Sequence, residues 1–450
     1  MFRHTIAAVA VLFATPVLAQ DVERMDEVVS ADADEGTFMG AALVAIGDDI
    51  VFDEAYGSAN LEWNIANTPA AKFRIGSVTK QFTAASILLL KERGLIDLDA
   101  PVKTYWPDAP PAWDAITVRN LLQHTSGITN VTDLDEFATV KFLPTTREEL
   151  IGRFADKPLE FTPGEKWDYS NSGYVLLSAI VEQVSGQDYA DFVKANIFDP
   201  LGMADTAIDV TADIVPRRAS GYAPSADGIV NAEYVNMAIP TGAGALYSTT
   251  HDLLKWQRAL FGGRLLEPAS LTEMTGPGVP AMAGATYGFG VLRTDDEDGT
   301  MIWHGGGIEG FNAMLMHDPD RDITVVVLAN LNGGQASDLG RSLLQLARGG
   351  EVVLPSERAA AETDVAALDA YEGTYALSPS FKIKVFVEDG KLMTQATGQA
   401  AFELFAQEGE EDFFFLKVVD AQLRFNRDDA GDVGSLTLYQ NGQEINGTKE

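Results

Sequence analysis

A serine and a lysine stand three positions apart in the segment FRIGSVTKQFTAASILLLKERG, where an apolar run with helical spacing begins. In a helix, Ser77 and Lys80 would project from the same side, so that the hydroxyl and the amine can meet. A lysine has a reference pKa of about 10.4, and burial or positive neighbours must lower that pKa before the amine acts as a base. The pair predicts an activated serine nucleophile. The alternative is a helix-capping serine beside a surface lysine.

A tyrosine and an asparagine follow a Pro-Gly turn in the segment PGEKWDYSNSGYVLL. Tyr169 and Asn171 precede a helical pattern, and a loop in this position can aim its side chains into a cleft. We predict that Tyr169 relays a proton among Ser77, Lys80 and a leaving group, and that Asn171 binds a substrate carbonyl. The alternative is a buried tyrosine bonded to backbone beside a helix-capping asparagine. A second Tyr-x-Asn, at 234–236, lacks the Pro-Gly lead and the following helix, so we prefer Tyr169.

A run of glycines follows a histidine in the segment WHGGGIEGF. His304, Gly305, Gly306 and Gly307 end or edge a predicted strand, and glycines there let a substrate backbone pair closely with that strand. Gly307 can also offer its backbone N–H to a substrate. The alternative is a flexible turn, which a glycine run by itself indicates.

The other histidines lack the spacing of metal ligands. We predict that His124 and His251 are structural, the first bonded to backbone in HTSG and the second capping a helix. No His-Glu-x-x-His pattern occurs, which disfavours a metal hydrolase, and no Gly-x-Ser-x-Gly elbow occurs, which disfavours an α/β-hydrolase. We therefore predict neither a metal nor another cofactor.

The elements that must position these residues come from distant parts of the sequence. Two β-prone runs, 38–46 and 50–56, flank the turn GDD and predict a hairpin, whereas 77–260 is predicted to be mostly helical. Strand patterns return over 300–331, and a helix over 337–348 follows. We infer an α/β (α+β) fold in which one antiparallel sheet, flanked by helices, is built from both ends of this region and interrupted by a helical subdomain.

A second, all-β domain is predicted at the end of the chain. The composition shifts to proline, serine, alanine and acidic residues over 351–367, which indicates a linker. Beyond it, the predicted domain, 368–450, has a first turn at Asp389-Gly390. A later hairpin uses Asn441-Gly442, because such a pair tolerates the positive φ angles of tight primed turns. The first domain then spans 20–350.

The first 19 residues are typical of a secretory signal peptide, with Arg3, a short apolar run over 6–13 and a small-residue cleavage site at 17–19. The alternative is an uncleaved membrane anchor, but the run is short for a span. We predict a periplasmic or secreted protein with no membrane span in its mature chain. The formal charge of −34 repels polyanions, which argues against nucleic-acid partners, and the absence of cysteine excludes a thiol nucleophile.

In this order, the three motifs resemble those of the penicillin-recognising serine hydrolases, which include class C β-lactamases, D-alanyl-D-alanine carboxypeptidases, D-aminopeptidases and esterases of the β-lactamase fold. The likeness covers about 36–344 and extends to LLQHTSGI and GAGALYSTTHDLLKW. It implies a β-lactamase/transpeptidase-like fold with Ser77 as the acylated nucleophile and Lys80 with Tyr169 as the acid/base pair. It also implies an oxyanion hole formed by the backbone N–H groups of Ser77 and Gly307.

One position departs from the family pattern. In β-lactamases and carboxypeptidases the third motif usually begins with lysine, whereas this chain has His304. A histidine is only partly charged near neutral pH, so we expect weak binding of the carboxylate of penicillins. The same His-Gly-Gly pattern resembles D-aminopeptidases and esterase-like members. The C-terminal domain resembles the lipocalin-like, barrel-like modules of some members. Three roles for it stay open: covering the active site, forming a homodimer and adding stability.

These features predict an exported serine hydrolase that acts through an acyl-enzyme on ester or amide bonds of a small molecule or peptide, with feeble β-lactamase activity. Carboxylesterase, D-aminopeptidase or amidase, and carboxypeptidase types all fit this prediction. The alternative is a penicillin-binding or sensing protein that deacylates slowly or not at all.

Overall fold

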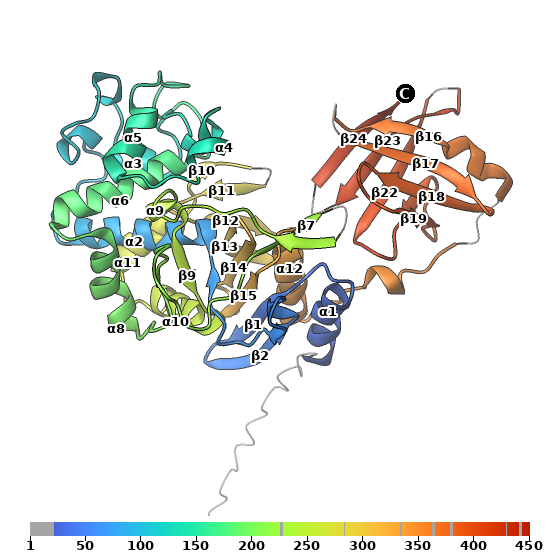
Figure 1. Cartoon of the computed structure of the whole chain (residues 1–450), viewed down its shortest axis with the longest axis horizontal. Helices are drawn as coiled ribbons and strands as arrows, with labels where there is room; N and C mark the ends of the chain where they lie inside the picture. Colours follow the sequence, from blue (N-terminus) through green and yellow to red (C-terminus); the bar gives the residue numbers. More distant parts are fainter. Residues whose placement is uncertain are drawn as a thin grey trace, which may run out of the picture.

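The chain forms a larger α/β part and a smaller all-β part (Figure 1). The computed structural model describes residues 22–225, 228–282, 284–333, 335–361, 365–378, 381–428, 430–440 and 443–450. The predicted signal peptide, 1–19, and the predicted turn at 441–442 lie outside these residues. Within the described ranges, no helix is both long and apolar enough to cross a bilayer.

The larger part is built on an eight-stranded antiparallel sheet, which confirms the predicted fold class. Its strand order is β10-β11-β12-β13-β14-β15-β1-β2, so the predicted N-terminal hairpin pairs with strands from the other end of this region. Leu43 of β1 lies opposite Val326 of β15, for example. The strands are β1 (Gly40–Ile46), β2 (Asp49–Tyr56), β10 (Val279–Pro280), β11 (Ala285–Tyr287), β12 (Leu292–Asp296), β13 (Gly299–Ile308), β14 (Phe311–Asp318) and β15 (Ile323–Ala329).

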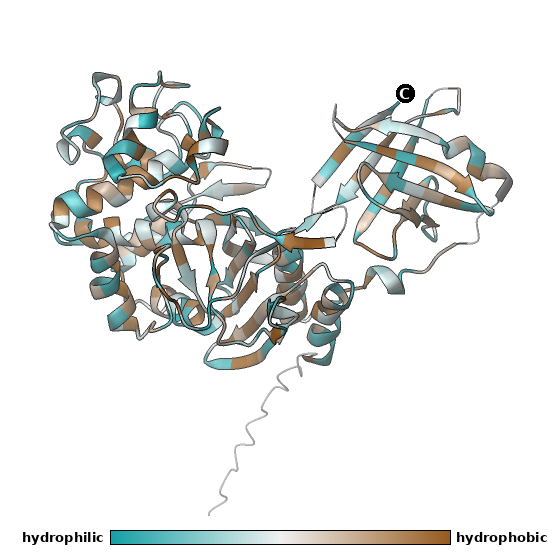
Figure 2. Cartoon of the chain, in the orientation of Figure 1, coloured by the Kyte–Doolittle hydropathy of each residue, from teal (hydrophilic) through white to brown (hydrophobic). Residues whose placement is uncertain are grey.

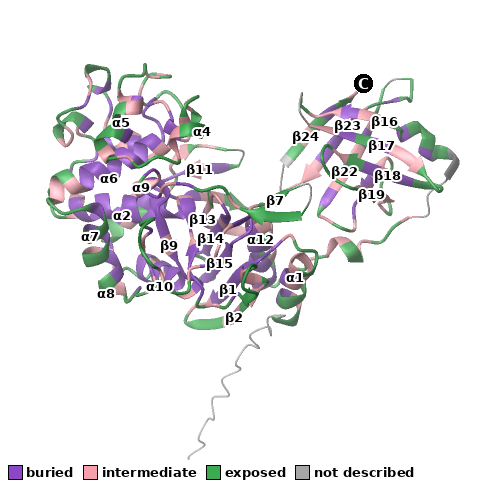
Figure 3. Ribbon diagram, in the orientation of Figure 1, coloured by how far each residue is buried: buried purple, intermediate pink, exposed green. Residues whose placement is uncertain are grey.

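Both faces of this sheet are covered by helices. Successive side chains of a strand point to opposite faces, so Ala42 and Val44 of β1 pack with helices α1 (Val22–Asp34) and α12 (Gln335–Ala347), whereas Leu43 packs with the helical region. The buried residues concentrate where these layers meet (Figure 3). The chain order therefore brings the start and the end of this region together, and the helices between them cover the remaining face.

The region between β2 and β10 contains the predicted helices and also short strands that the sequence pattern did not predict. Strands β5, β9 and β6 form a small sheet, and β3–β4 and β7–β8 are pairs. The helices are α2 (Thr79–Glu92), α3 (Val118–Leu122), α4 (Phe137–Val140), α5 (Arg147–Ala155), α6 (Asn171–Ser185), α7 (Tyr189–Val193), α8 (Asp199–Leu201), α9 (Thr241–Gly244), α10 (Thr250–Phe261) and α11 (Pro268–Thr275). The short strands are β3 (Ser58–Asn60), β4 (Ile65–Ala66), β5 (Phe73–Arg74), β6 (Ala207–Ile208), β7 (Tyr222–Ser225), β8 (Gly228–Asn231) and β9 (Leu246–Ser248). These strands are too short to show an alternating pattern in sequence.

The C-terminal part is a nine-stranded antiparallel sheet in the order β19-β18-β17-β16-β24-β23-β22-β21-β20. Its two edge strands are separated in sequence by Leu404 alone, so the sheet nearly closes into a barrel, as predicted. Apolar side chains such as Tyr375 and Phe425 fill its interior, and hydrophobic residues follow its strands in Figure 2. The turn between β17 and β18 has positive φ at both Asp389 and Gly390, as a primed turn requires. The strands are β16 (Gly373–Ala376), β17 (Lys382–Glu388), β18 (Lys391–Ala396), β19 (Ala401–Glu403), β20 (Phe405–Ala406), β21 (Phe413–Phe415), β22 (Ala421–Arg427), β23 (Val433–Gln440) and β24 (Gln443–Lys449).

Short helical turns connect these elements. They are the 3₁₀ turns η1 (Gly76–Val78), η2 (Val102–Thr104), η3 (Pro111–Trp113), η4 (Val131–Asp133), η6 (Pro355–Glu357) and η7 (Val365–Tyr371), and the π-helical turn η5 (Lys194–Phe198). The predicted linker, 351–367, contains η6, and Ala360 within it forms a β-bridge with Gln407 of the barrel. Arg24 of α1 also pairs with Glu357, which holds this linker against the larger part.

Carboxylates gather where α1, α12 and the C-terminal barrel meet. Asp32, Glu35, Asp338 and Asp420 line one cavity of about 90 Å³. Burial, followed by the negative charges of Glu35, Asp338 and Asp420, raises the pKa of Asp32 to about 7. Near neutral pH, the folded protein therefore retains a proton here that the unfolded chain releases.

We predict that Asp32→Asn stabilises the protein at alkaline pH. Because folding raises the pKa of Asp32, the folded state binds more protons than the unfolded state between about pH 4 and 7, and the free energy of unfolding falls as the pH rises through this range. At about pH 8 we expect a thermal midpoint roughly 2 °C above that of the wild type, with no gain at about pH 4. The exposed Asp34 on the same helix provides the control, and an equal gain in Asp34→Asn would contradict the explanation.

Candidate active site

Ser77 lies in the turn η1, between strand β5 and helix α2, rather than in the first turn of α2 itself. Gly76 has a φ of 49°, and a Cβ at this position would lie 2.8 Å from the backbone nitrogen of Gly307. A Cβ on Gly306 would lie 2.0 Å from the carbonyl oxygen of Ile75 and 3.2 Å from the backbone nitrogen of Ser77. Only glycine permits this approach, so the glycines of β13 hold the serine turn against the sheet.

Lys80 lies on the first turn of α2 and is fully buried. Its Nζ lies 3.0 Å from Ser77 Oγ, 2.8 Å from Asn171 Oδ1 and 2.8 Å from the carbonyl oxygen of Ala243 in α9. The Nζ also lies 4.8 Å from the centre of the Tyr169 ring. All of these partners are uncharged, and burial lowers the pKa of Lys80 well below its usual value.

Tyr169 reaches the same serine from the loop before α6. Its hydroxyl donates a hydrogen bond of 2.8 Å to Ser77 Oγ. Burial raises the pKa of Tyr169, so the phenol keeps its proton at neutral pH. The rival Tyr234 is 50% exposed, although the neighbouring Val235 lines the cavity beside Ser77.

Asn171 is the first residue of α6 and joins the group through its side chain. Its Oδ1 accepts the bond from Lys80, while its Nδ2 donates to Thr132 Oγ1 at 3.3 Å. Its backbone N–H donates to Asn130 Oδ1 at 2.9 Å, which anchors the start of the helix. The structure therefore brings Ser77, Lys80, Tyr169 and Asn171 into one connected set of hydrogen bonds.

His304, Gly305, Gly306 and Gly307 lie on β13, beyond the point where its neighbour β12 ends. Strand β12 pairs with β13 only as far as Trp303, whereas β14 pairs along the whole glycine run. One edge of this stretch is therefore not paired with β12. The strand position agrees with the sequence prediction, and the turn alternative is wrong.

The charge expected on His304 is absent. The ring is 4% exposed, with Nδ1 at 2.6 Å from the carbonyl oxygen of Gly305 and Nε2 at 3.1 Å from the hydroxyl of Tyr287. A carbonyl oxygen only accepts, so Nδ1 carries the proton and Nε2 accepts from Tyr287. Burial lowers the pKa of His304 to about 3. The imidazole is therefore neutral at pH 7, rather than partly charged as the sequence suggested.

A cavity of about 290 Å³ opens beside Ser77 and Gly307. Its wall is mainly apolar, with side chains from η4, α4, α6 and the loop before α9. Glu309 is the one acidic residue of this lining, and it pairs with Lys141, which also pairs with Glu233. The apolar wall residues are Val131, Phe137, Val175, Val235, Ile239, Pro240, Ala243 and Ile308.

Sequence reasoning missed the aromatic shell behind Tyr169. The rings of His124, Tyr174 and Tyr287 lie close together there, and the centres of the His124 and Tyr169 rings are 4.4 Å apart. The HTSG motif indicated that His124 bonds to backbone, but it did not indicate which backbone groups. No signal in the sequence marked Tyr287. His251 lies elsewhere and pairs with Asp53. In the part of the chain that the structure describes, no group of three or more His, Cys, Asp or Glu side chains is arranged to hold a metal.

Comparison with known proteins agrees with the resemblance seen in the motifs. The beta-lactamase family model matches residues 25–348, and a domain of unknown function (DUF3471) matches residues 357–449. Penicillin-binding protein 4* of Bacillus subtilis is 30% identical over 436 residues, which cover 90% of this chain and 94% of that protein.

Solved structures give the same result. The octameric penicillin-binding protein homologue from Pyrococcus abyssi has 27% identity and a TM-score of 0.69, covering 95% of this chain and 100% of that chain. The D-amino acid amidase from Ochrobactrum anthropi SV3 has 26% identity and a TM-score of 0.65, covering 73% of this chain and 99% of that chain. With its family match spanning most of the sequence, this chain belongs to the beta-lactamase family, together with the serine β-lactamases and penicillin-binding proteins.

Proposed function

We propose that this protein is a serine hydrolase that acts through an acyl-enzyme, with Ser77 as the nucleophile. The observation that carries this proposal is that Ser77 Oγ lies within hydrogen-bond distance of both Lys80 Nζ and the Tyr169 hydroxyl, at 3.0 and 2.8 Å. A hydroxyl becomes a nucleophile when a positioned base takes its proton. Membership of the beta-lactamase family supports a hydrolase at the level of the class.

The partners of Lys80 favour its role as that base. A neutral amine has two hydrogens and one lone pair. The oxygens of Asn171 and Ala243 only accept hydrogen bonds, so they take both hydrogens and leave the lone pair directed at Ser77 Oγ. The serine hydroxyl then donates to Lys80 and accepts from Tyr169. The lowered pKa of Lys80 makes this neutral form accessible.

In acylation, Ser77 Oγ attacks the substrate carbonyl carbon, and its proton passes to Lys80. Backbone N–H groups of Ser77 and Gly307 stabilise the oxyanion that forms. The protonated Tyr169 gives its proton to the leaving group and regains one from Lys80, while Asn171 binds the substrate carbonyl on the acyl side. Water then hydrolyses the acyl-enzyme, which releases the acid and restores the Ser77 hydroxyl.

The substrate is an ester or amide with an apolar acyl group and no carboxylate beside the scissile bond. The apolar cavity supports the first property, while the neutral His304 and the acidic Glu309 support the second, because neither offers a cation to an anion. An esterase or an amidase acting on D-amino-acid derivatives fits these features, and the amidase relative supports the latter. We also propose that the protein is exported and that its mature chain begins after residue 19; homodimer formation through 368–450 stays a prediction.

The lifetime of the acyl-enzyme separates a hydrolase from a penicillin-binding or sensing protein. We expect intact-mass measurements with p-nitrophenyl esters to show a transient gain equal to the acyl group, and Ser77→Ala to show none. A persistent ester adduct on the wild type would favour the sensing alternative. Labelling of Ser77→Ala would exclude Ser77 as the nucleophile.

The proposed base predicts a pH dependence. Deprotonated Lys80 is the active form and its pKa is lowered, so acylation should reach its full rate at a lower pH than an ordinary lysine would allow and fall as the pH drops below that pKa. Lys80→Arg, which is permanently charged, should slow acylation about 1,000-fold, as measured by stopped-flow release of p-nitrophenol. Lys91→Arg, on the same helix and paired with Glu273, is the matched control and should remain near the wild-type rate. Equal rates for the two variants would rule out Lys80 as the base.

The neutral His304 predicts how charge selects the substrate. His304→Lys should raise kcat/KM for a penicillin about tenfold relative to that for a neutral ester, because an ammonium binds the β-lactam carboxylate. His304→Gln, which stays uncharged, should leave this ratio unchanged. Turnover of nitrocefin by the wild type at the rate of its best ester would contradict the argument.

A further inference from the structure

His124 bonds the backbone on both sides of Tyr169. The N–H of Asp168 donates to the carbonyl oxygen of His124 at 2.8 Å, and the N–H of Ser170 donates to His124 Nδ1 at 3.1 Å. Asp168 and Ser170 are the neighbours of Tyr169 in the chain, so a single residue binds the backbone N–H groups of both neighbours of the tyrosine. The imidazole also contacts the tyrosine ring, with centres 4.4 Å apart.

This double contact depends on an uncommon backbone conformation. His124 has a φ of 56°, in the left-handed region that few non-glycine residues adopt. Such a conformation is unfavourable for a residue with a Cβ and persists only where the surroundings enforce it. The left-handed turn allows the carbonyl oxygen and the side chain of the same residue to reach successive parts of one segment.

The residues around His124 enforce the turn. The carbonyl oxygen of Asn120, in α3, accepts a hydrogen bond of 2.8 Å from the N–H of Thr125. The Asn120 side chain donates from Nδ2 to Thr125 Oγ1 at 3.0 Å, and its Oδ1 accepts from Thr117.

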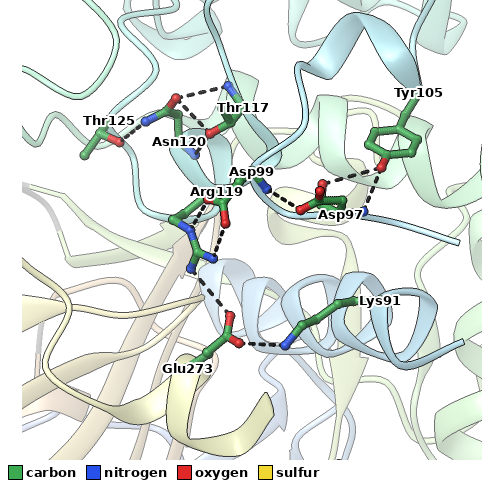
Figure 4. A network of polar contacts seen from close by, with 9 residues as sticks. All are labelled: Lys91, Asp97, Asp99, Tyr105, Thr117, Arg119, Asn120, Thr125 and Glu273. Atoms are coloured by element: carbon green, nitrogen blue, oxygen red, sulfur yellow. Dashed lines mark hydrogen bonds and ion pairs between the residues drawn. The ribbon is translucent and has the colours of Figure 1, made fainter. Parts of the chain in front are cut away.

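Arg119 joins Asp99 to Glu273, and this fixes α3 against the helices below it (Figure 4). The turn that carries His124 is therefore anchored to α2 and α11.

The imidazole must be neutral to hold Ser170. Because Nδ1 accepts a hydrogen bond, the ring proton lies on Nε2. Burial lowers the pKa of His124 well below its usual value. Nε2 is buried and has no hydrogen-bond partner among the described residues, and the rings of Tyr174 and Tyr287 lie around the imidazole. Nothing in its surroundings therefore turns the acceptor nitrogen away from Ser170.

We propose that His124 is a positioning residue for the reaction, which fixes the Tyr169 hydroxyl on Ser77 Oγ by binding the backbone N–H groups of Asp168 and Ser170, on either side of Tyr169. This inference rests on the proposed function, because it assigns His124 an effect on the proton relay through Tyr169. A misplacement of a reacting group by about 1 Å can lower a rate 100-fold. The role thus differs from packing alone, since it depends on an acceptor atom at the position of Nδ1.

Two substitutions that both suit the left-handed backbone separate these roles. His124→Gly keeps the carbonyl bond to Asp168 but removes the acceptor for Ser170, whereas His124→Asn places a side-chain oxygen near that position. We expect His124→Gly to lower kcat for a p-nitrophenyl ester about 100-fold with KM within about threefold, and His124→Asn to recover at least about tenfold of that loss. Recovery by asparagine is the readout that a packing role does not produce.

The control variant is His317→Ala. His317 is also buried, stacks on Phe261 and bonds Thr324, but it belongs to β14 away from Tyr169. The His317→Ala variant should have a lower thermal stability than the wild type but an unchanged kcat. The positioning role is overturned if folded His124→Gly keeps kcat within about threefold of the wild type, or if His124→Asn is as slow as His124→Gly. Absence of any Ser77-dependent adduct in the wild type would instead overturn the proposed function, so the two failures are distinguishable.

Discussion

The site depends on the burial of one amine among uncharged oxygens. Lys80 is fully buried, and each oxygen that it contacts belongs to a different element: η1, α6 and α9. An amine exposed to water would be protonated, and a neighbouring carboxylate would also stabilise the protonated form. The packing of these elements around α2 keeps both water and carboxylates away from Lys80, and this makes a lysine suitable as a base.

Close backbone contact between the serine turn and the sheet is the second requirement. Gly76 and Gly306 leave no room for a Cβ, so η1 lies directly against β13. The same strand carries Gly307, whose backbone is the expected partner of Ser77 in the oxyanion hole. Since β13 is held in register by β14 and the rest of the sheet, the geometry of the site follows from the core of the fold.

Desolvation gives each titratable group of the site a definite protonation state. His304 and His124 are neutral, and Tyr169 remains a phenol. Neutral rings can share a small apolar space in an acidic protein, where several charges would repel or require water. The formal charge of −34 and the neutral site support the proposal that the substrate has no carboxylate beside the scissile bond.

The sequence alone determined the parts that depend on local spacing. Ser77 and Lys80 are three residues apart, so any helical turn there brings their side-chain tips together, and the apolar, β-prone runs of β1, β14 and β15 predicted the sheet. The Asp389-Gly390 turn followed for the same local reason. Tertiary structure decided the rest: the neutral state of His304, the protonated Tyr169, the apolar cavity and the contact of His124 with the segment around Tyr169. These depend on burial and on residues far apart in the chain, and one sequence contains no measure of either, because desolvation and long-range contact arise only when the elements pack.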